Sequence, residues 1–560
     1  HPKFPGPPKG NVVSNSQGLV FASAEWVPGG GEWWANFTVV VSNYSTEDLV
    51  DPEISFTFAE GRIIRNNYGL VFEESDRPVE AVTGRFVAER KIILAQSSQE
   101  FTVAMQNGGP GAGTDPGLLP NGFTVNGQDA NPPVDNDPPT VPEKLRATGW
   151  APHSLQLAWD PSTDNVAVAS YVIEYGTPGG ETHTWPTRTP GATVSRLNSL
   201  TEYRLRVRAI DVSGNRSDLS EEISATTTAP LPDPGDWDAR RAPFVDYTAW
   251  PNPKIAEYGS LSGVDAFFTG FLVAQPSGDK KVYWGGYPSL GEATTSDFGK
   301  EDMNAFAAHG GKVILSFGGA SNVPLEDVET DVSRIAATYR AILANYGATY
   351  LDFDFEGGFI HNQPGLERHV AAISQVLAAQ PGLKISYTLP VDGAPGSLVG
   401  FNDGGVRLLQ LLADAGIQPS LINGMLMEFG QTSPPDAYEC CVIALNGMFT
   451  QIAAAWPGWD EQKVWRRIGA CPMFGRHING KIFTLDHMRR LVDFARTNNL
   501  GCLSGWDASR DYNQGRLPEC ADFSGSDLAK CTYVEQNSFD FSKIIATYQP
   551  EHIPAVSQRR

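Results

Sequence analysis

The pattern of apolar and polar positions divides the chain into three blocks. In residues 1–130, apolar and polar residues alternate in short runs that Gly, Asn and Asp separate, such as Trp34–Val41, Ile54–Phe58 and Phe101–Met105. Alternation with a period of two predicts half-buried β-strands. Helical periodicity is scarce in this block, so we expect an all-β sandwich.

The second block, residues 138–227, shows the same alternation more regularly. Its clearest runs are Leu155–Trp159, Tyr171–Tyr175 and Tyr203–Ala209. Leu200 and Tyr203 have the spacing of a tyrosine corner, in which a phenol ties a loop to a sandwich. Over its whole length the block resembles a fibronectin type III domain. The resemblance implies a second all-β sandwich that acts as a spacer.

The third block, residues 242–550, alternates strand and helix patterns. The expected strands are Phe244–Ala249, Ala266–Val273, Lys312–Phe317, Tyr350–Phe355, Lys384–Leu389, Ile422–Phe429, Val464–Ala470 and Gly501–Trp506. Helical patterns fall between them, for example at Asp331–Asn345, Gly365–Ala379 and Thr484–Asn498. Eight such units predict a (β/α)8 TIM barrel. A doubly wound open sheet is the alternative, but it normally carries a Gly-rich phosphate loop after its first strand, and none occurs here.

Segments rich in Pro and Asp separate the blocks. We expect linkers at residues 131–137 and 228–241, because proline stiffens such segments and acidic residues keep them solvated. Residues 551–560 are expected to form a tail.

Composition and charge narrow the classes of function. The 560 residues are 41% hydrophobic and 19% charged, which is typical of globular domains. The formal net charge of -22 repels phosphate backbones, so we expect no nucleic-acid partner. No apolar run is long enough to span a membrane, so we expect no membrane partner.

The cysteines and the first residue bear on the compartment. The chain begins at His1 without a Met, as a processed secreted protein does, so we expect a secreted, extracellular protein. All six cysteines lie in the last quarter, and an even number in an exported chain predicts up to three disulfides. Cys520 and Cys531 are close enough in sequence to close a local loop. The alternative is six buried thiols in a cytosolic enzyme.

Three acidic residues end the fourth predicted strand. Side chains alternate along a strand, so Asp352, Asp354 and Glu356 are expected to point together into the barrel. Phe353 and Phe355 then point towards the helices. Each buried carboxylate raises the cost of ionising its neighbour, so we expect one of them to stay protonated, as a general acid requires.

Three interpretations of these acids compete. They could hold a magnesium ion, or they could form a buried structural network. They could also be an acid catalyst with two supporting carboxylates. An ordinary glycosidase places its nucleophile on another strand, and no such residue is evident here. The nucleophile could then come from the substrate itself, as the oxygen of a 2-acetamido group, in substrate-assisted hydrolysis.

The sequence LDFDFEGG resembles the catalytic signature DxxDxDxE of the family-18 glycoside hydrolases, the chitinases. Supporting motifs occur in order around the expected barrel: Ser316-Phe317-Gly318-Gly319, Tyr387-Thr388-Leu389-Pro390, Met425-Leu426-Met427-Glu428-Phe429-Gly430, and Trp506 with Ser509-Arg510-Asp511. The resemblance covers essentially the whole third block and is closest to secreted bacterial chitinases.

The resemblance implies a role for each residue. Glu356 is the expected proton donor to the glycosidic oxygen, and Asp354 holds the acetamido N–H and steadies an oxazolinium intermediate. Asp352 shares a proton with Asp354, and Trp506 forms the floor under the sugar. The implied reaction hydrolyses β-1,4 bonds of chitin or chitooligosaccharides with retention and uses no metal or organic cofactor.

Two positions depart from the family pattern. Thr349 replaces the first Asp of the signature. The sixth-strand motif often reads MxYD, but Met427 and Glu428 stand where Tyr and Asp are usual. We expect Met425, Met427 and Glu428 to contact the substrate, and Tyr387 could supply the missing hydroxyl.

The first block carries candidate carbohydrate-binding aromatics, Trp26, Trp33 and Trp34. Aromatic faces stack on sugar rings, so exposed tryptophans suit a polysaccharide surface, and the block loosely resembles family-2 carbohydrate-binding modules. The competing interpretation is a core role, since one of Trp33 and Trp34 is expected to point inward. We expect a monomeric chitinase. The alternatives are a non-catalytic chitin-binding lectin and an endo-β-N-acetylglucosaminidase that acts on N-glycans.

Overall fold

The computed structural model describes residues 20–550, apart from residues 46, 69, 73–78, 89, 90, 95, 96, 107, 132, 133, 396–398 and 524–526. The chain forms two compact units, His1–Thr228 and Ala229–Arg560. The expected tail 551–560 and part of the expected linker 131–137 lie outside the described residues.

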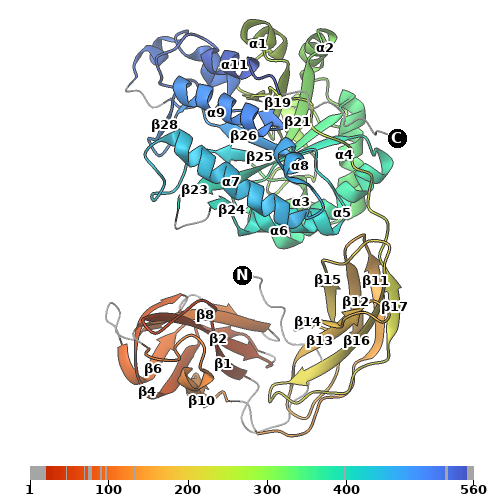
Figure 1. Ribbon diagram of the computed structural model, residues 1–560, viewed down its shortest axis with the longest axis vertical. Helices are drawn as coiled ribbons and strands as arrows, with labels where there is room; N and C mark the ends of the chain where they lie inside the picture. Colours follow the sequence, from red (N-terminus) through yellow and green to blue (C-terminus); the bar gives the residue numbers. More distant parts are fainter. Residues whose placement is uncertain are drawn as a thin grey trace, which may run out of the picture. The chain divides into compact units, whose positions relative to one another are not determined.

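The amino-terminal region is built from antiparallel strands, as the alternating pattern predicts (Figure 1). Its main sheet has the order β1-β2-β8-β4-β6-β5, and β9 also pairs with β4. The strands are β1 Val20–Trp26, β2 Trp34–Asn43, β4 Glu53–Tyr68, β5 Val71–Phe72, β6 Val79–Val87, β8 Ser97–Gln106, β9 Asn121–Val125 and β10 Gln128–Asp129, with the short pair β3 Leu49–Val50 and β7 Ile92–Ile93. Phe37, Phe56 and Phe58 meet edge to face in the core, where apolar burial stabilises the fold.

Residues 143–226 form the second sandwich. One sheet has the order β11-β12-β15 and the other β14-β13-β16-β17. The strands are β11 Glu143–Trp150, β12 Leu155–Asp160, β13 Val168–Gly176, β14 His183–Thr187, β15 Gly191–Val194, β16 Glu202–Asp211 and β17 Ile223–Thr226. Trp159 and Tyr171 pack at 5.3 Å between their ring centroids. The Tyr203 hydroxyl accepts a hydrogen bond from the Asn198 N–H at 2.8 Å, which confirms the tyrosine corner.

The second unit is a parallel barrel with helices around it (Figure 1). The barrel strands are β18 Phe244–Asp246, β19 Ala266–Val273, β21 Lys312–Gly318, β22 Tyr350–Asp354, β23 Lys384–Gly393, β25 Leu421–Leu426, β26 Ile468–Pro472 and β29 Cys502–Leu503. The sheet closes on itself because the Ala242 N–H donates to the Leu503 carbonyl and the Leu503 N–H donates to the Arg240 carbonyl. This architecture confirms the predicted TIM barrel preceded by two all-β sandwiches.

The helices of this unit cover the outside of the barrel. They are α1 Ile255–Ser262, α2 Lys300–Ala308, α3 Leu325–Val328, α4 Val332–Tyr346, α5 Gln363–Ala379, α6 Asp403–Asp414, α7 Ala437–Ala455, α8 Glu461–Arg466, α9 Leu485–Asn498, α10 Ala508–Asn513 and α11 Asp540–Ala546. The loops contain four short strands within the described residues: β20 Tyr283–Trp284, β24 Val399–Phe401, β27 Gly475–Arg476 and β28 Ile482–Phe483. The expected helices match α4, α5 and α9 to within two residues.

The seventh strand begins later than its apolar run predicts. The side chain of Asp460 accepts the Lys463 N–H and caps α8, so Val464 belongs to that helix and β26 starts at Ile468. Val464 is buried on the inner face of the helix, which explains why its apolar character imitates a strand.

The cysteines form fewer bridges than the predicted maximum of three. Cys520 and Cys531 are joined in a disulfide that closes a loop with a sequence separation of 11. Cys440, Cys441, Cys471 and Cys502 are free and buried, so they pack as small apolar side chains.

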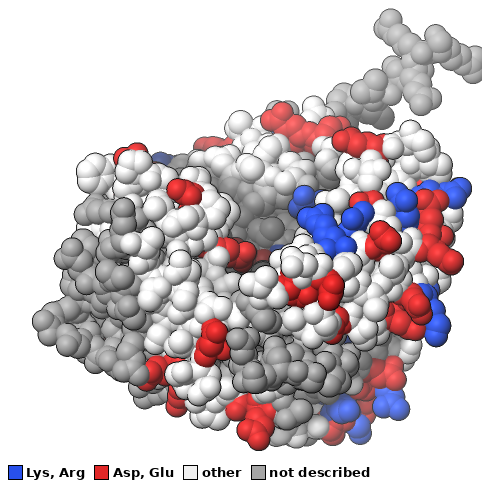
Figure 2. Space-filling model, turned by 90° about the horizontal axis from the view of Figure 1, so that it is seen from below, with Lys and Arg blue, Asp and Glu red and all other residues white. Residues whose placement is uncertain are grey.

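No helix of the described residues is long and apolar enough to cross a membrane. On the face shown in Figure 2, acidic side chains are widely scattered and basic ones gather in the right half of the view.

Candidate active site

The three acids lie at the carboxyl end of β22, in the direction that strand alternation predicts. Asp352 is fully buried, Asp354 is 5% exposed, and Glu356 is half-buried just beyond the strand. Phe353 and Phe355 face the other way and pack against His369 of α5. The carboxylates thus run from the barrel interior towards solvent, and Glu356 is the outermost of them.

Hydroxyl groups from the two neighbouring strands surround Asp352. Ser316 Oγ of β21 donates to one carboxylate oxygen at 2.6 Å, and Thr388 Oγ1 of β23 donates to the other at 2.8 Å. Burial raises the pKa of Asp352 to about 7, although these hydroxyls favour its ionised form. Two hydrogen bonds therefore hold the Asp352 side chain in place, and its pKa lies near neutral pH.

Asp354 lies between the other two acids and is buried among like charges. Burial raises its pKa well above the usual value, and the charge of Glu356, a hydrogen bond with Glu356 and the charge of Asp352 add to the effect. Its Oδ1 atom is buried without a hydrogen-bond partner. The structure thus hydrogen-bonds Asp354 with Glu356, whereas the sequence-based expectation has Asp354 sharing a proton with Asp352.

Two glycines, the last residue of β21 and the one that follows it, make room for this arrangement. Gly318 and Gly319 have φ angles of 103° and 85°, which favour glycine. A Cβ atom on Gly318 would collide with the carbonyl oxygen of Asp354, and one on Gly319 would lie 2.7 Å from the Phe271 ring. The motif Ser316-Phe317-Gly318-Gly319 therefore serves two purposes, a hydroxyl for Asp352 and close packing at the strand end.

An aromatic surface lies at the same end of the barrel. Trp506 is half-buried and stacks on Phe271, with ring centroids 5.7 Å apart and ring planes 15° apart. The Trp506 N–H donates to the Pro472 carbonyl, and its own carbonyl accepts the Phe474 N–H. These two main-chain hydrogen bonds fix the backbone that carries the indole. Phe271 was not predicted from the sequence, since a Phe near the end of an apolar strand is indistinguishable from a core residue.

The three candidate residues of the sixth strand, Met425, Met427 and Glu428, differ in burial and contacts. Met425 is buried, and Met427 is half-buried in the same cluster as Trp506 and Phe271. Glu428 is exposed, and its carboxylate accepts the N–H groups of Ile478 at 2.6 Å and Asn479 at 3.0 Å. These bonds attach Glu428 to the 478–479 backbone, and its contact with substrate stays a prediction.

Tyr387 does not replace the missing sixth-strand tyrosine, so its predicted contact with substrate is wrong. The side chain is fully buried, and its hydroxyl pairs with His369 Nε2 at 2.7 Å. Tyr387 is in register with Phe353 and stacks on it, on the helix side of the sheet. The inward residue on this strand is the adjacent Thr388, which bonds Asp352.

The tryptophans of the amino-terminal region differ in exposure. Trp26 is half-buried, packs against Phe37 and donates its indole N–H to the Asp115 carbonyl at 2.8 Å. Trp33 and Trp34 are 78% and 44% exposed. The expectation that one of them points inward is wrong, because β2 begins only at Trp34 and strand alternation does not yet apply to Trp33.

In the second unit, Trp250 is 86% exposed, whereas Trp284, Trp456 and Trp459 are buried. Trp250 follows β18 and so lies beyond the carboxyl end of a barrel strand, the end at which TIM barrels carry their active sites.

The second unit is thus a TIM barrel with a row of acids at the carboxyl end of its fourth strand. Comparison with known proteins extends this. The family model "Fibronectin type III domain" matches residues 137–226. The probable bifunctional chitinase/lysozyme of Escherichia coli (strain K12) is 27% identical over 287 residues, which is 49% of this chain and 31% of that protein. Endochitinase 11 of Metarhizium anisopliae is 26% identical over 283 residues, 48% of this chain and 52% of that protein.

Solved structures also include similar proteins. The catalytic domain of a hyperthermophilic chitinase from Pyrococcus furiosus is 24% identical, with a TM-score of 0.47, and the match covers 56% of this chain and 97% of that one. The chain spans about a third and about half of the two curated relatives above. It is a modular relative of the chitinases that contains a fibronectin type III domain.

Proposed function

We propose that this protein hydrolyses the β-1,4 bonds of chitin or chitooligosaccharides with retention of configuration, through an oxazolinium intermediate. The observation that carries the proposal is the row of acids in which buried Asp352 and Asp354 support a half-buried Glu356. The curated relatives named chitinase support the same substrate class.

In the proposed first step, Glu356 donates its proton to the glycosidic oxygen. The carbonyl oxygen of the 2-acetamido group attacks the anomeric carbon, and the bond to the leaving sugar breaks. Asp354 accepts a hydrogen bond from the acetamido N–H, which steadies the positive charge of the oxazolinium ring.

In the second step, water attacks the anomeric carbon and gives its proton to Glu356, which restores the acid. Because two displacements occur at one carbon, the product keeps the β configuration. Asp352 lies deeper in the barrel than Asp354 and Glu356. Hydrogen bonds from Ser316 and Thr388 tune its pKa, and its protonation state sets how much negative charge lies next to Asp354.

The aromatic surface of Trp506 and Phe271 supplies the apolar face on which a sugar ring stacks. Trp250 is a further platform at the same end of the barrel. On the amino-terminal region, the exposed rings of Trp33 and Trp34 suit binding to an insoluble polysaccharide. The proposed protein acts outside the cell, as a monomer.

Product analysis on colloidal chitin tests the proposal with wild type and Glu356→Gln side by side. The substitution keeps the shape of the side chain and removes the transferable proton. We expect release of soluble N-acetylglucosamine oligomers to fall at least about 1,000-fold. Glu367→Gln on the exposed face of α5 is the matched control, because it makes the same chemical change away from the site. Unchanged hydrolysis by Glu356→Gln refutes the proposed acid. No oligomer release by either protein favours the lectin alternative.

A further inference from the structure

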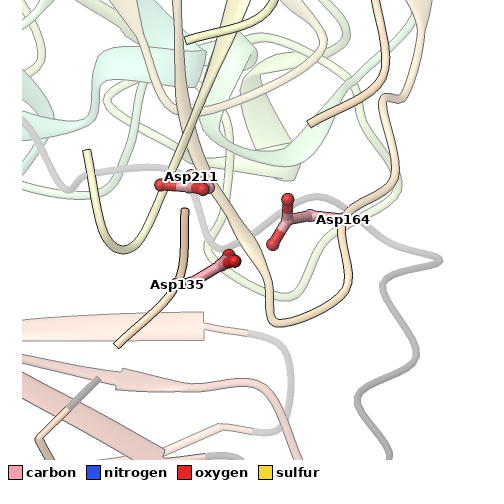
Figure 3. Close-up of side chains that lie close together, drawn as sticks. All are labelled: Asp135, Asp164 and Asp211. Atoms are coloured by element: carbon pink, nitrogen blue, oxygen red, sulfur yellow. The ribbon is translucent and has the colours of Figure 1, made fainter. Parts of the chain in front are cut away.

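We propose that the fibronectin type III region binds one Ca²⁺ ion through Asp135, Asp164 and Asp211. One carboxylate oxygen from each residue lies within 4.8 Å of the other two. Figure 3 shows the three carboxyl groups gathered around a common space, with that of Asp135 pointing towards Asp164. They come from the segment before β11, the loop between β12 and β13, and the end of β16.

Two oxygens of this cluster are buried acceptors without a donor. Asp135 is only 9% exposed, and its Oδ2 atom has no hydrogen-bond partner. Oδ1 of Asp164 is buried and unpartnered as well. Burying a carboxylate oxygen without a donor or a cation is costly, and here two such atoms belong to one group of acids. A cation would satisfy both.

The partners of the remaining oxygens orient these side chains. Asp135 Oδ1 accepts the side-chain N–H of Asn165 at 3.0 Å and the N–H of Asp137 at 3.0 Å, and these bonds lower the pKa of Asp135. Asp164 Oδ2 accepts the N–H groups of Val166 and Ala167. In both residues N–H groups thus hold one oxygen, which leaves the other available to a metal ion.

Asp211 and Asn215 make the remaining hydrogen bonds around the three acids. Asp211 is 2% exposed, and its oxygens accept the N–H groups of Ser213 and Asn215 and the side-chain amide of Asn215. The same amide donates to the Asp135 carbonyl at 2.9 Å, which ties the entry segment to the end of β16. No Lys or Arg forms an ion pair with the three acids in the part of the chain that the structure describes, so no basic side chain offsets their charge.

The donor set favours Ca²⁺ over other cations. All ligand atoms are oxygens, and Ca²⁺ accepts six to eight oxygens in flexible geometry, with water in the remaining positions. Mg²⁺ demands a near-ideal octahedron and dehydrates reluctantly, and neither His nor Cys is in the cluster to favour zinc. Because Asp135 precedes the sandwich, the ion would fasten the connecting segment to the end of the domain.

Calorimetric titration of the EDTA-treated full chain with CaCl₂ at pH 7 tests this site. We expect one binding event in wild type, with a dissociation constant at or below about 1 mM, as for extracellular calcium modules. Asp164→Asn and Asp135→Asn are each expected to weaken binding at least about tenfold, since affinity follows the number of charged ligands. The matched control is Asp218→Asn, an exposed acid of the same domain outside the cluster, which should bind as wild type does.

Thermal unfolding of the same proteins distinguishes the ion from a shared proton. CaCl₂ should raise the melting temperature of wild type and of Asp218→Asn and leave that of Asp164→Asn unchanged, with MgCl₂ less effective than CaCl₂. Circular dichroism establishes that each variant is folded. The proposal is overturned if wild type binds no Ca²⁺ at 10-fold the expected constant (about 10 mM). It is equally overturned if Asp164→Asn and Asp135→Asn bind as tightly as wild type, or if only acidification stabilises the cluster.

Discussion

The hydroxyl groups around Asp352 allow a quantitative prediction for Thr388→Val. The substitution keeps the shape of a buried side chain and removes the hydroxyl that donates to Asp352 at 2.8 Å. A hydrogen bond to a charged group contributes about 1.5–3 kcal/mol, against about 1 kcal/mol for a neutral one. The ionised form of Asp352 therefore loses about 1.4 kcal/mol more than the protonated form, which raises its pKa by about one unit.

The sign of the pH dependence follows from linkage. The pKa of Asp352 is about 7 in the folded protein, above its usual value of 3.8. As pH rises from 3.8 to about 7, the unfolded chain ionises this carboxyl while the folded protein keeps it protonated, so the free energy of unfolding falls. At pH 5 both proteins hold Asp352 protonated, and Thr388→Val costs only the neutral hydrogen bonds, including the weak one from Asn423 at 3.3 Å. At pH 9 the variant should lose a further amount of about 1.4 kcal/mol in the free energy of unfolding.

Urea unfolding followed by tryptophan fluorescence at pH 5 and pH 9 measures this difference. The matched control is Thr269→Val, because Thr269 is equally buried in the barrel but donates to the Ile314 carbonyl and touches no carboxylate. Its effect should be the same at both pH values. Equal destabilisation by Thr388→Val at pH 5 and pH 9 would refute the assigned interaction between the hydroxyl and an ionisable Asp352.

Three further predictions follow from particular contacts. Phe271→Ala removes the ring stacked on Trp506 and should lower kcat/KM on chitooligosaccharides about tenfold, with the exposed Phe523→Ala as a control that stays near wild type. Tyr387→Phe should keep kcat within about twofold, because the hydroxyl faces His369, and should cost about 1 kcal/mol of stability in urea unfolding; a large loss of kcat would show that the hydroxyl reaches the substrate. Opening the disulfide by replacing Cys520 and Cys531 with Ser should reduce the free energy of unfolding by about 3 kcal/mol, and an unchanged denaturation midpoint would contradict this.

The sequence allowed the fold to be predicted because hydrophobic periodicity reports directly on burial. The row of acids on β22 was predictable for the same reason, since residues two apart on a strand share a side. The start of β26 could not be predicted in this way. Val464 is apolar because it is buried in α8, the helix that Asp460 caps.

Contacts between distant segments account for the remaining differences. Tyr387 and Thr388 are adjacent, and only the register of β23 with β22 decides which of them faces Asp352. The carboxylate of Glu428 accepts backbone N–H groups from about fifty residues later in the chain, and no local sequence pattern predicts these bonds. The residues Asp135, Asp164 and Asp211 are far apart in the sequence, and only the folded domain brings the three segments that carry them together.

The central claim is that the substrate's own acetamido oxygen is the nucleophile and Glu356 is the acid. The most direct test compares initial rates on chitooligosaccharide analogues whose N-acetyl groups carry zero, one, two or three fluorine atoms. Fluorine withdraws electrons from the carbonyl oxygen with little change in size. The account predicts a progressive fall in kcat that reaches at least about 100-fold, or roughly 2.7 kcal/mol in the barrier, for the trifluoroacetyl substrate. Rates that do not depend on the number of fluorine atoms would contradict it.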